Sequence, residues 1–187
     1  DMAALLGHVC AAVAQVDPGL RIVAKLHPAE RADTQAAHAA LASAFPDVHF
    51  LFRAHMTELV ERAAAVVTIN STVGFEAILL DRPVVALGRN FYITPGVVEV
   101  VEDLAALPHQ LARALDTPID RERRRALLRF VTTDFLAHGS YDDCREQSVQ
   151  AIARRIVERL SPLLGGAVAD RPVGVRATPA WAAAVTS

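Results

Sequence analysis

The sequence lacks an excess of charge of either sign. Its 187 residues include 19 basic and 21 acidic side chains, which leaves a formal net charge of −2. Proteins whose main partner is a nucleic acid or an anionic membrane usually carry a basic surface, so the charge balance supports neither partner. Lysine is almost absent as well, because only one of the 19 basic residues is a lysine, Lys25. We attribute this ratio to genome composition rather than to function.

Cysteine and extended apolar runs are also scarce. The two cysteines, Cys10 and Cys144, lie far apart and form no CxxC pair. This excludes a disulfide framework and a cysteine zinc site, and it favours a reducing cytoplasm. The seven histidines show no HExxH spacing, so we expect no metal and no other cofactor. Every apolar run is broken well short of the roughly 20 residues that a membrane-spanning helix needs.

Several nucleotide and hydrolase motifs are missing. The sequence contains no GxGxxG, no GxxxxGK[ST] and no GxSxG, which argues against a dinucleotide dehydrogenase, a P-loop NTPase and an α/β-hydrolase. It also shows no signal peptide, because it opens on Asp1-Met2 and enters an amphipathic helix directly. We interpret this opening as that of a piece excised from a longer protein.

The chain instead alternates apolar strands with helices. Hydrophobic residues make up 52% of it, which is typical of a globular protein with a buried sheet. We expect strands at 20–26, 48–52, 65–69 and 84–87, and helices at 2–16, 32–44, 56–64, 72–80, 102–115, 120–137 and 143–160. This order predicts an α/β fold, a Rossmann-like parallel sheet with helices on both faces, within one domain at 1–160. Residues 161–187 show no periodicity and are predicted to be a tail.

The polar turn after the third predicted strand is the leading candidate site. Asn70, Ser71 and Thr72 lie where a buried strand leads into a helix N-terminus, and Gly74 leaves the backbone there open to close approach. Backbone N–H groups and the helix dipole favour an anion at such a position. Ordinary capping of the helix by Ser71 is the alternative, and both roles use the same helix end. Glu76 follows in an apolar segment.

The Glu76 carboxylate needs hydrogen-bond donors if it is buried. Ribose hydroxyls would serve as donors, and so would an ion pair with Arg82 or Arg89. The sequence leaves these alternatives open.

Residues after the other strands are predicted to reach the same edge of the sheet. Right-handed crossovers bring the carboxyl ends of parallel strands together, and ligands bind at that edge. Lys25 lies near the end of the first strand and His27 and Pro28 follow it, where Pro28 restricts the backbone of His27 and aims its imidazole. An imidazole there can donate to a phosphate, whereas capping or loop packing is the simpler alternative.

Three further loop residues are candidates for contacts with a phosphate or an acidic sugar. They are Arg53, Arg89 and Tyr92. Arginine binds phosphates and carboxylates through two parallel hydrogen bonds, although most loop arginines point into solvent.

Three segments together resemble the capsule polysaccharide biosynthesis proteins, the β-Kdo transferases that build the Kdo linker of bacterial capsules. The segments are Lys25–Pro28 (KLHP), Ser71–Leu87 (STVGFEAILLDRPVVAL) and Asn90–Gly96 (NFYITPG). The family pattern runs HP, then SxxGxEA with LxxPV, then a phenylalanine-tyrosine loop that ends in GLT. This sequence departs from it at Gly96-Val97-Val98. The resemblance covers roughly residues 20–100.

The resemblance implies the C-terminal, nucleotide-sugar-binding half of a GT-B glycosyltransferase. Its donor would be CMP-Kdo, and its reaction would invert the sugar carbon without a metal. His27 would contact the CMP phosphate and take up leaving-group charge, Ser71 and Thr72 would bind the phosphate, and Glu76 would hold the ribose or position the helix.

The same resemblance implies that the acceptor, a glycolipid or an oligosaccharide, is bound by an N-terminal half that the chain lacks. The fragment alone should therefore bind nucleotide weakly and should not turn over. A cytoplasmic location is expected, with peripheral association with the inner membrane as an open alternative. Two other functions also stay open: another GT-B-type enzyme (a UDP-sugar transferase or epimerase, or a polyol-phosphate transferase) and a non-catalytic Rossmann-like assembly module.

Overall fold

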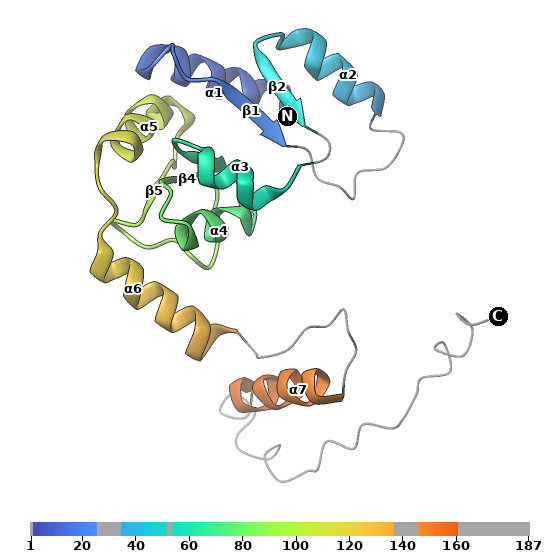
Figure 1. Ribbon diagram of the computed structural model, residues 1–187, viewed down its shortest axis with the longest axis vertical. Helices are drawn as coiled ribbons and strands as arrows, with labels where there is room; N and C mark the ends of the chain where they lie inside the picture. Colours follow the sequence, from blue (N-terminus) through green and yellow to red (C-terminus); the bar gives the residue numbers. More distant parts are fainter. Residues whose placement is uncertain (1, 26–34, 52–53, 137–145, 161–187) are drawn as a thin grey trace, which may run out of the picture. The chain divides into compact units, whose positions relative to one another are not determined.

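The computed structural model describes residues 2–25, 35–51, 54–136 and 146–160 (Figure 1). Contacts divide the chain into two compact units, Asp1–Phe130 and Val131–Ser187. The boundary falls inside the helix that the sequence predicts at 120–137, whereas the predicted domain continues to residue 160. The predicted tail at 161–187 lies outside the described residues.

Helices and strands alternate along the first unit. Its elements are α1 (Met2–Val16), β1 (Ile22–Lys25), α2 (Gln35–Ala44), β2 (Val48–Leu51), α3 (Met56–Arg62), β3 (Val66–Thr68), α4 (Val73–Leu79), β4 (Val84–Ala86), β5 (Val98–Val100), the 3-10 turn η2 (Leu104–Ala106), α5 (Leu107–Asp116) and α6 (Arg121–Phe130). All strand pairs are parallel, and helices flank them. The α/β, Rossmann-like fold class predicted from the sequence is therefore confirmed.

The strands form two parallel sheets rather than one. β1 pairs with β2, and a second sheet has the order β3-β4-β5. In the second sheet Val66 lies opposite Val84, and Val84 lies opposite Val98. Within the described ranges no ladder joins the two sheets, so the single sheet expected from the sequence is not formed there. β5 is a strand that the sequence reading missed.

One predicted helix is interrupted for a local reason. Residues 102–115 were expected to form a single helix, but α5 begins only at Leu107, with Pro108 in its first turn. Proline lacks the N–H that continues a helix from the preceding turn, and it suits a helix start. The preceding residues form η2, whose N-terminus is capped by Asp103: its carboxylate accepts a hydrogen bond from the Ala105 N–H at 3.0 Å.

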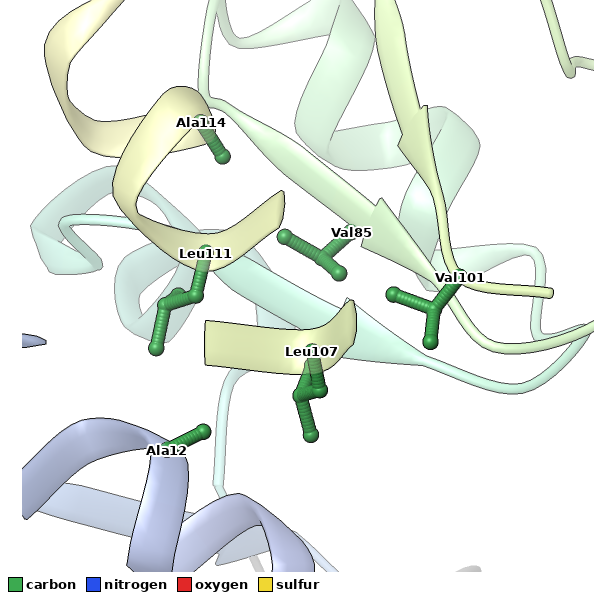
Figure 2. Packing of buried hydrophobic residues seen from close by; sticks show 6 residues of the cluster. All are labelled: Ala12, Val85, Val101, Leu107, Leu111 and Ala114. Atoms are coloured by element: carbon green, nitrogen blue, oxygen red, sulfur yellow. The ribbon is translucent and has the colours of Figure 1, made fainter. Parts of the chain in front are cut away.

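The main apolar core lies between β4 and the helices α1 and α5. Figure 2 shows its six buried residues, Ala12, Val85, Val101, Leu107, Leu111 and Ala114. Because side chains alternate along a strand, Val85 faces this core while Val84 and Ala86 face the other side. α4 contacts β3 and β4, and β4 lies between α4 and α5 in Figure 1. This packing holds the carboxyl ends of β3 and β4 in a fixed place.

The second unit contains a π-helical turn, Val131–Phe135, and helix α7 (Glu146–Leu160). Arg155 donates a hydrogen bond to the Thr133 carbonyl at 3.0 Å, and Arg155 and Arg159 both donate to the Asp134 carbonyl. These bonds tie α7 to the end of the π-helical turn. No helix in the described part of the chain is both long enough and apolar enough to cross a membrane.

Candidate functional site

The loops that follow β3 and β4 run against each other at the carboxyl edge of the three-stranded sheet. The Leu87 N–H donates to the Thr68 carbonyl at 2.8 Å, which continues the pairing just beyond the two strands. At Gly88 a Cβ atom would lie 2.9 Å from the Ile69 carbonyl oxygen, closer than ordinary contacts allow. Glycine at this position therefore permits the close approach that brings the two loops together.

The predicted polar turn begins directly after β3. Its backbone is held by local hydrogen bonds: the Ser71 N–H donates to Thr68 Oγ1 at 3.2 Å, and the Gly74 N–H donates to the Ser71 carbonyl at 3.2 Å. The Val73 N–H donates to Ser71 Oγ, also at 3.2 Å. Ser71 thus caps the start of α4, as the alternative role allowed, while its O–H hydrogen stays available as a donor.

The outer surface of this turn is polar and accessible. Asn70, Ser71 and Thr72 are all exposed. None of the described residues accepts a hydrogen bond from the Thr72 backbone N–H. The turn therefore offers two hydroxyl groups and one backbone N–H to a ligand in solution, a donor set suited to phosphate oxygens.

Tyr92 lies differently from its sequence prediction. Its side chain is 0% exposed, and its hydroxyl donates to the Ser71 carbonyl at 2.6 Å. Burial raises the pKa of the Tyr92 phenol, an effect that a hydrogen bond with Thr68 partly offsets. The phenol is therefore protonated near neutral pH and acts as a donor. In this arrangement Tyr92 supports the turn from inside, and it does not line the surface that a sugar would meet.

Gly74 makes room for the Tyr92 ring. A Cβ atom at this position would lie 2.3 Å from the Tyr92 hydroxyl oxygen and 2.6 Å from its Cζ, distances that no side chain can accept. The space that we expected Gly74 to leave for a ligand is thus filled by an aromatic ring of the same protein. The rings of Phe75 and Phe91 extend this contact, with centroids 5.5 Å apart and Tyr92 beside both.

Glu76 is half-buried in the first turn of α4. Among the described residues, neither Arg82 nor Arg89 forms an ion pair with its carboxylate. The Arg82 Nε atom is buried without a hydrogen-bond partner, and Arg89 is exposed on the loop after β4. The ion-pair alternative is therefore not realised in this part of the structure.

The C-terminal end of α4 is closed by protein groups, a feature that the sequence reading missed. The Arg82 N–H donates to the Ala77 carbonyl at 2.8 Å and the Asp81 N–H to the Ile78 carbonyl at 3.2 Å, the pattern of a Schellman motif. Asp81 has φ 59°, a conformation that aspartate tolerates better than most residues.

Arg124 on α6 completes this closure. Its Nε donates to the Ile78 carbonyl at 2.7 Å and its Nη2 to the Leu79 carbonyl at 3.0 Å. The arginine-rich helix α6 thus includes one arginine with a structural role.

The remaining predicted residues are not gathered at this turn. His27, Pro28 and Arg53 lie outside the described residues. Lys25 ends β1 in the two-stranded sheet, where it is half-buried. The structure therefore brings Ser71, Gly74 and Tyr92 into one contact, with Asn70, Thr72 and Glu76 on the same short segment. The placement of His27 beside the turn stays a prediction.

Two hollows that share Pro83 and Thr117 in their lining lie at the opposite edge of the sheet. One has a volume of about 160 Å³ and is lined by residues at the start of β4 and β5 and by the end of α5, among them Pro83, Val97 and Thr117. It is separated from the turn by the length of β4, and it carries no cluster of catalytic groups. Within the described ranges no three metal-binding side chains come together.

Comparison with known proteins places the turn inside a matched region. The model of a family described as capsule polysaccharide biosynthesis protein matches residues 2–126. Protein FixF of Sinorhizobium fredii (strain NBRC 101917 / NGR234) is 36% identical over 127 residues, which cover 67% of this chain and 30% of FixF. The chain thus spans less than a third of that relative. No solved structure matches the chain.

Proposed function

This chain belongs to the capsule polysaccharide biosynthesis protein family, and we propose that it is the donor-binding half of a GT-B glycosyltransferase in capsule synthesis. The donor in this proposal is CMP-Kdo, and the transfer inverts the sugar carbon without a metal. A role in capsule polysaccharide synthesis follows from the family. The donor, the mechanism and the GT-B assembly are the further parts of this proposal.

The exposed polar turn after β3 carries the proposal. It lies at the carboxyl edge of a parallel sheet, where ligands of such sheets bind. The hydroxyls of Ser71 and Thr72 are exposed there, beside the Thr72 N–H. In the proposed complex these groups donate hydrogen bonds to the phosphate of CMP, and Asn70 borders the same position, while Gly74 admits the Tyr92 ring beneath it.

The other predicted residues take roles around this phosphate. His27, held by Pro28, would donate to the phosphate and stabilise the charge that develops on the departing CMP. Glu76 would accept hydrogen bonds from the ribose, since neither Arg82 nor Arg89 occupies its carboxylate in the described structure. Lys25, Arg53 and Arg89 are the cationic groups proposed to meet the sugar carboxylate.

The acceptor and the general base belong to a further part of the protein. We propose that a second, N-terminal half binds a glycolipid or oligosaccharide acceptor and provides the base. We further propose that the enzyme works in the cytoplasm, with peripheral contact to the inner membrane if its acceptor is lipid-linked.

Calorimetric titration of the full-length protein with CMP, UDP and CDP tests the proposed donor. We expect CMP to bind at least about tenfold more tightly than UDP, a difference of roughly 1.4 kcal/mol. The isolated 187-residue chain should bind CMP weakly and transfer no sugar. A preference for UDP would indicate another GT-B-type enzyme, and binding of none of the three would favour the assembly module. Sugar transfer by the isolated chain would contradict the proposed division into two halves.

A further inference from the structure

Tyr92 is the largest fully buried side chain in the described part of the protein, yet it comes from a loop. The loop joins β4 to β5, and its own shape is held by Asn90, whose Oδ1 accepts a hydrogen bond from the Tyr92 N–H at 3.3 Å. The ring packs against both Phe75 and Phe91, which also contact each other, and it covers Gly74. A phenol buried this deeply needs a hydrogen-bond acceptor, and the Ser71 carbonyl provides it.

Ser71 is consequently fixed at each of its polar groups. Thr68 accepts from its N–H, Tyr92 and Gly74 donate to its carbonyl, and Val73 donates to its side-chain oxygen. Only the bond from Tyr92 comes from outside the segment that runs from β3 into α4. The partner lies 21 residues away in sequence, so this bond couples the shape of the turn to the loop after β4.

We infer that Tyr92 is a positioning residue for the donor site, and that Gly74 is the matching position that admits its ring. The pair sets the direction of the Ser71 hydroxyl by holding the carbonyl of the same residue. Tyr92 itself touches no substrate. The expected effect on nucleotide binding rests on the proposed function. The coupling between the loop after β4 and the turn rests only on the contacts of Tyr92 with Ser71 and Gly74.

Three single variants (Tyr92→Phe, Gly74→Ala and Tyr92→Leu) and one double variant separate the parts of this coupling. Tyr92→Phe keeps the ring and removes the hydrogen bond. Gly74→Ala keeps the hydroxyl and places a methyl group against the ring. The double variant Gly74→Ala with Tyr92→Leu makes room for that methyl group, so its properties should resemble those of Tyr92→Leu alone. Residues in direct contact give such non-additive effects, whereas independent residues do not.

The first measurement is amide hydrogen exchange of the full-length protein, which needs no ligand. We expect Tyr92→Phe to speed exchange at Ser71, Val73 and Gly74 by about tenfold or more, as loss of a buried hydrogen bond of roughly 1–1.5 kcal/mol would. The control is Leu111→Ala, which destabilises the core on the other side of β4 without touching the turn. Unchanged exchange at the turn in Tyr92→Phe, or the same pattern in Leu111→Ala, would overturn the inference.

The second measurement is the affinity of the same variants for CMP. Tyr92→Phe should weaken CMP binding about tenfold at a temperature where circular dichroism shows the variant to be fully folded, because a misplaced donor group costs binding without unfolding the protein. Gly74→Ala should weaken it more, and the double variant should recover to the level of Tyr92→Leu. Wild-type affinity in Tyr92→Phe would overturn the positioning role. If the wild type itself binds no nucleotide, the proposed function fails, and the exchange data alone decide on the coupling.

Discussion

The two ends of helix α4 are built in opposite ways. At the C-terminal end, the carbonyls of Ala77, Ile78 and Leu79 accept bonds from the following turn and from Arg124. At the N-terminal end, Ser71 and Thr72 keep their hydroxyls exposed. A helix of seven residues is too short to be stable alone, so its place depends on such contacts. The closed end holds the helix, and the open end is the one that we propose for the phosphate.

The largest expected effect comes from the apolar core on the other side of β4 from helix α4. Leu111→Ala removes a side chain that is 3% exposed, and it should lower the free energy of unfolding by about 2–5 kcal/mol. Chemical denaturation of the first unit, or of the full-length protein, measures this loss. Nucleotide affinity of the folded fraction should not change, because Leu111 lies on α5. A selective loss of affinity without loss of stability would show that core and site are not separate.

Removal of the closure at the C-terminal end should have a smaller effect on stability. Arg124→Ala removes the two hydrogen bonds that the guanidinium donates to the carbonyls of Ile78 and Leu79. We expect this loss to lower the free energy of unfolding by about 1–3 kcal/mol. Arg125→Ala is the matched control, because Arg125 is an exposed neighbour on the same helix. Thermal and urea unfolding of both variants measure the difference. Equal stability of the two variants would mean that Arg124 does not close α4.

The fold followed from the sequence where the pattern is local. Apolar strands alternating with helices predicted the α/β class, and each predicted strand corresponds to one of β1 to β4. β5 was missed because Glu99 interrupts Val98–Val100, so that this strand shows no continuous apolar run, unlike the equally short β4. The pairing of β1 with β2 in a separate sheet depends on contacts between distant segments, which periodicity does not report.

The candidate site was likewise predictable where its signal is local and not where it depends on contacts between distant segments. The turn at Asn70–Thr72 was found because a polar cluster between a strand and a helix is a local signal. The structural role of Gly74 could not be predicted, because the ring that it accommodates belongs to Tyr92 in another loop. The sequence shows only that a small residue stands at this position. The available signal was the phenylalanine-tyrosine pair at Phe91 and Tyr92. The sequence predicts Tyr92 as a contact for the sugar, whereas in the structure it is a buried support of the turn.

The most direct test of the open end of α4 is CMP affinity of the full-length protein with Ser71→Ala. Loss of one hydroxyl that donates to a charged phosphate should weaken binding about 10- to 100-fold, the equivalent of roughly 1.5–3 kcal/mol. Ser43→Ala, an exposed serine on α2, is the control and should bind CMP as the wild type does. If Ser71→Ala is folded and binds CMP with wild-type affinity, the turn after β3 is not the phosphate site.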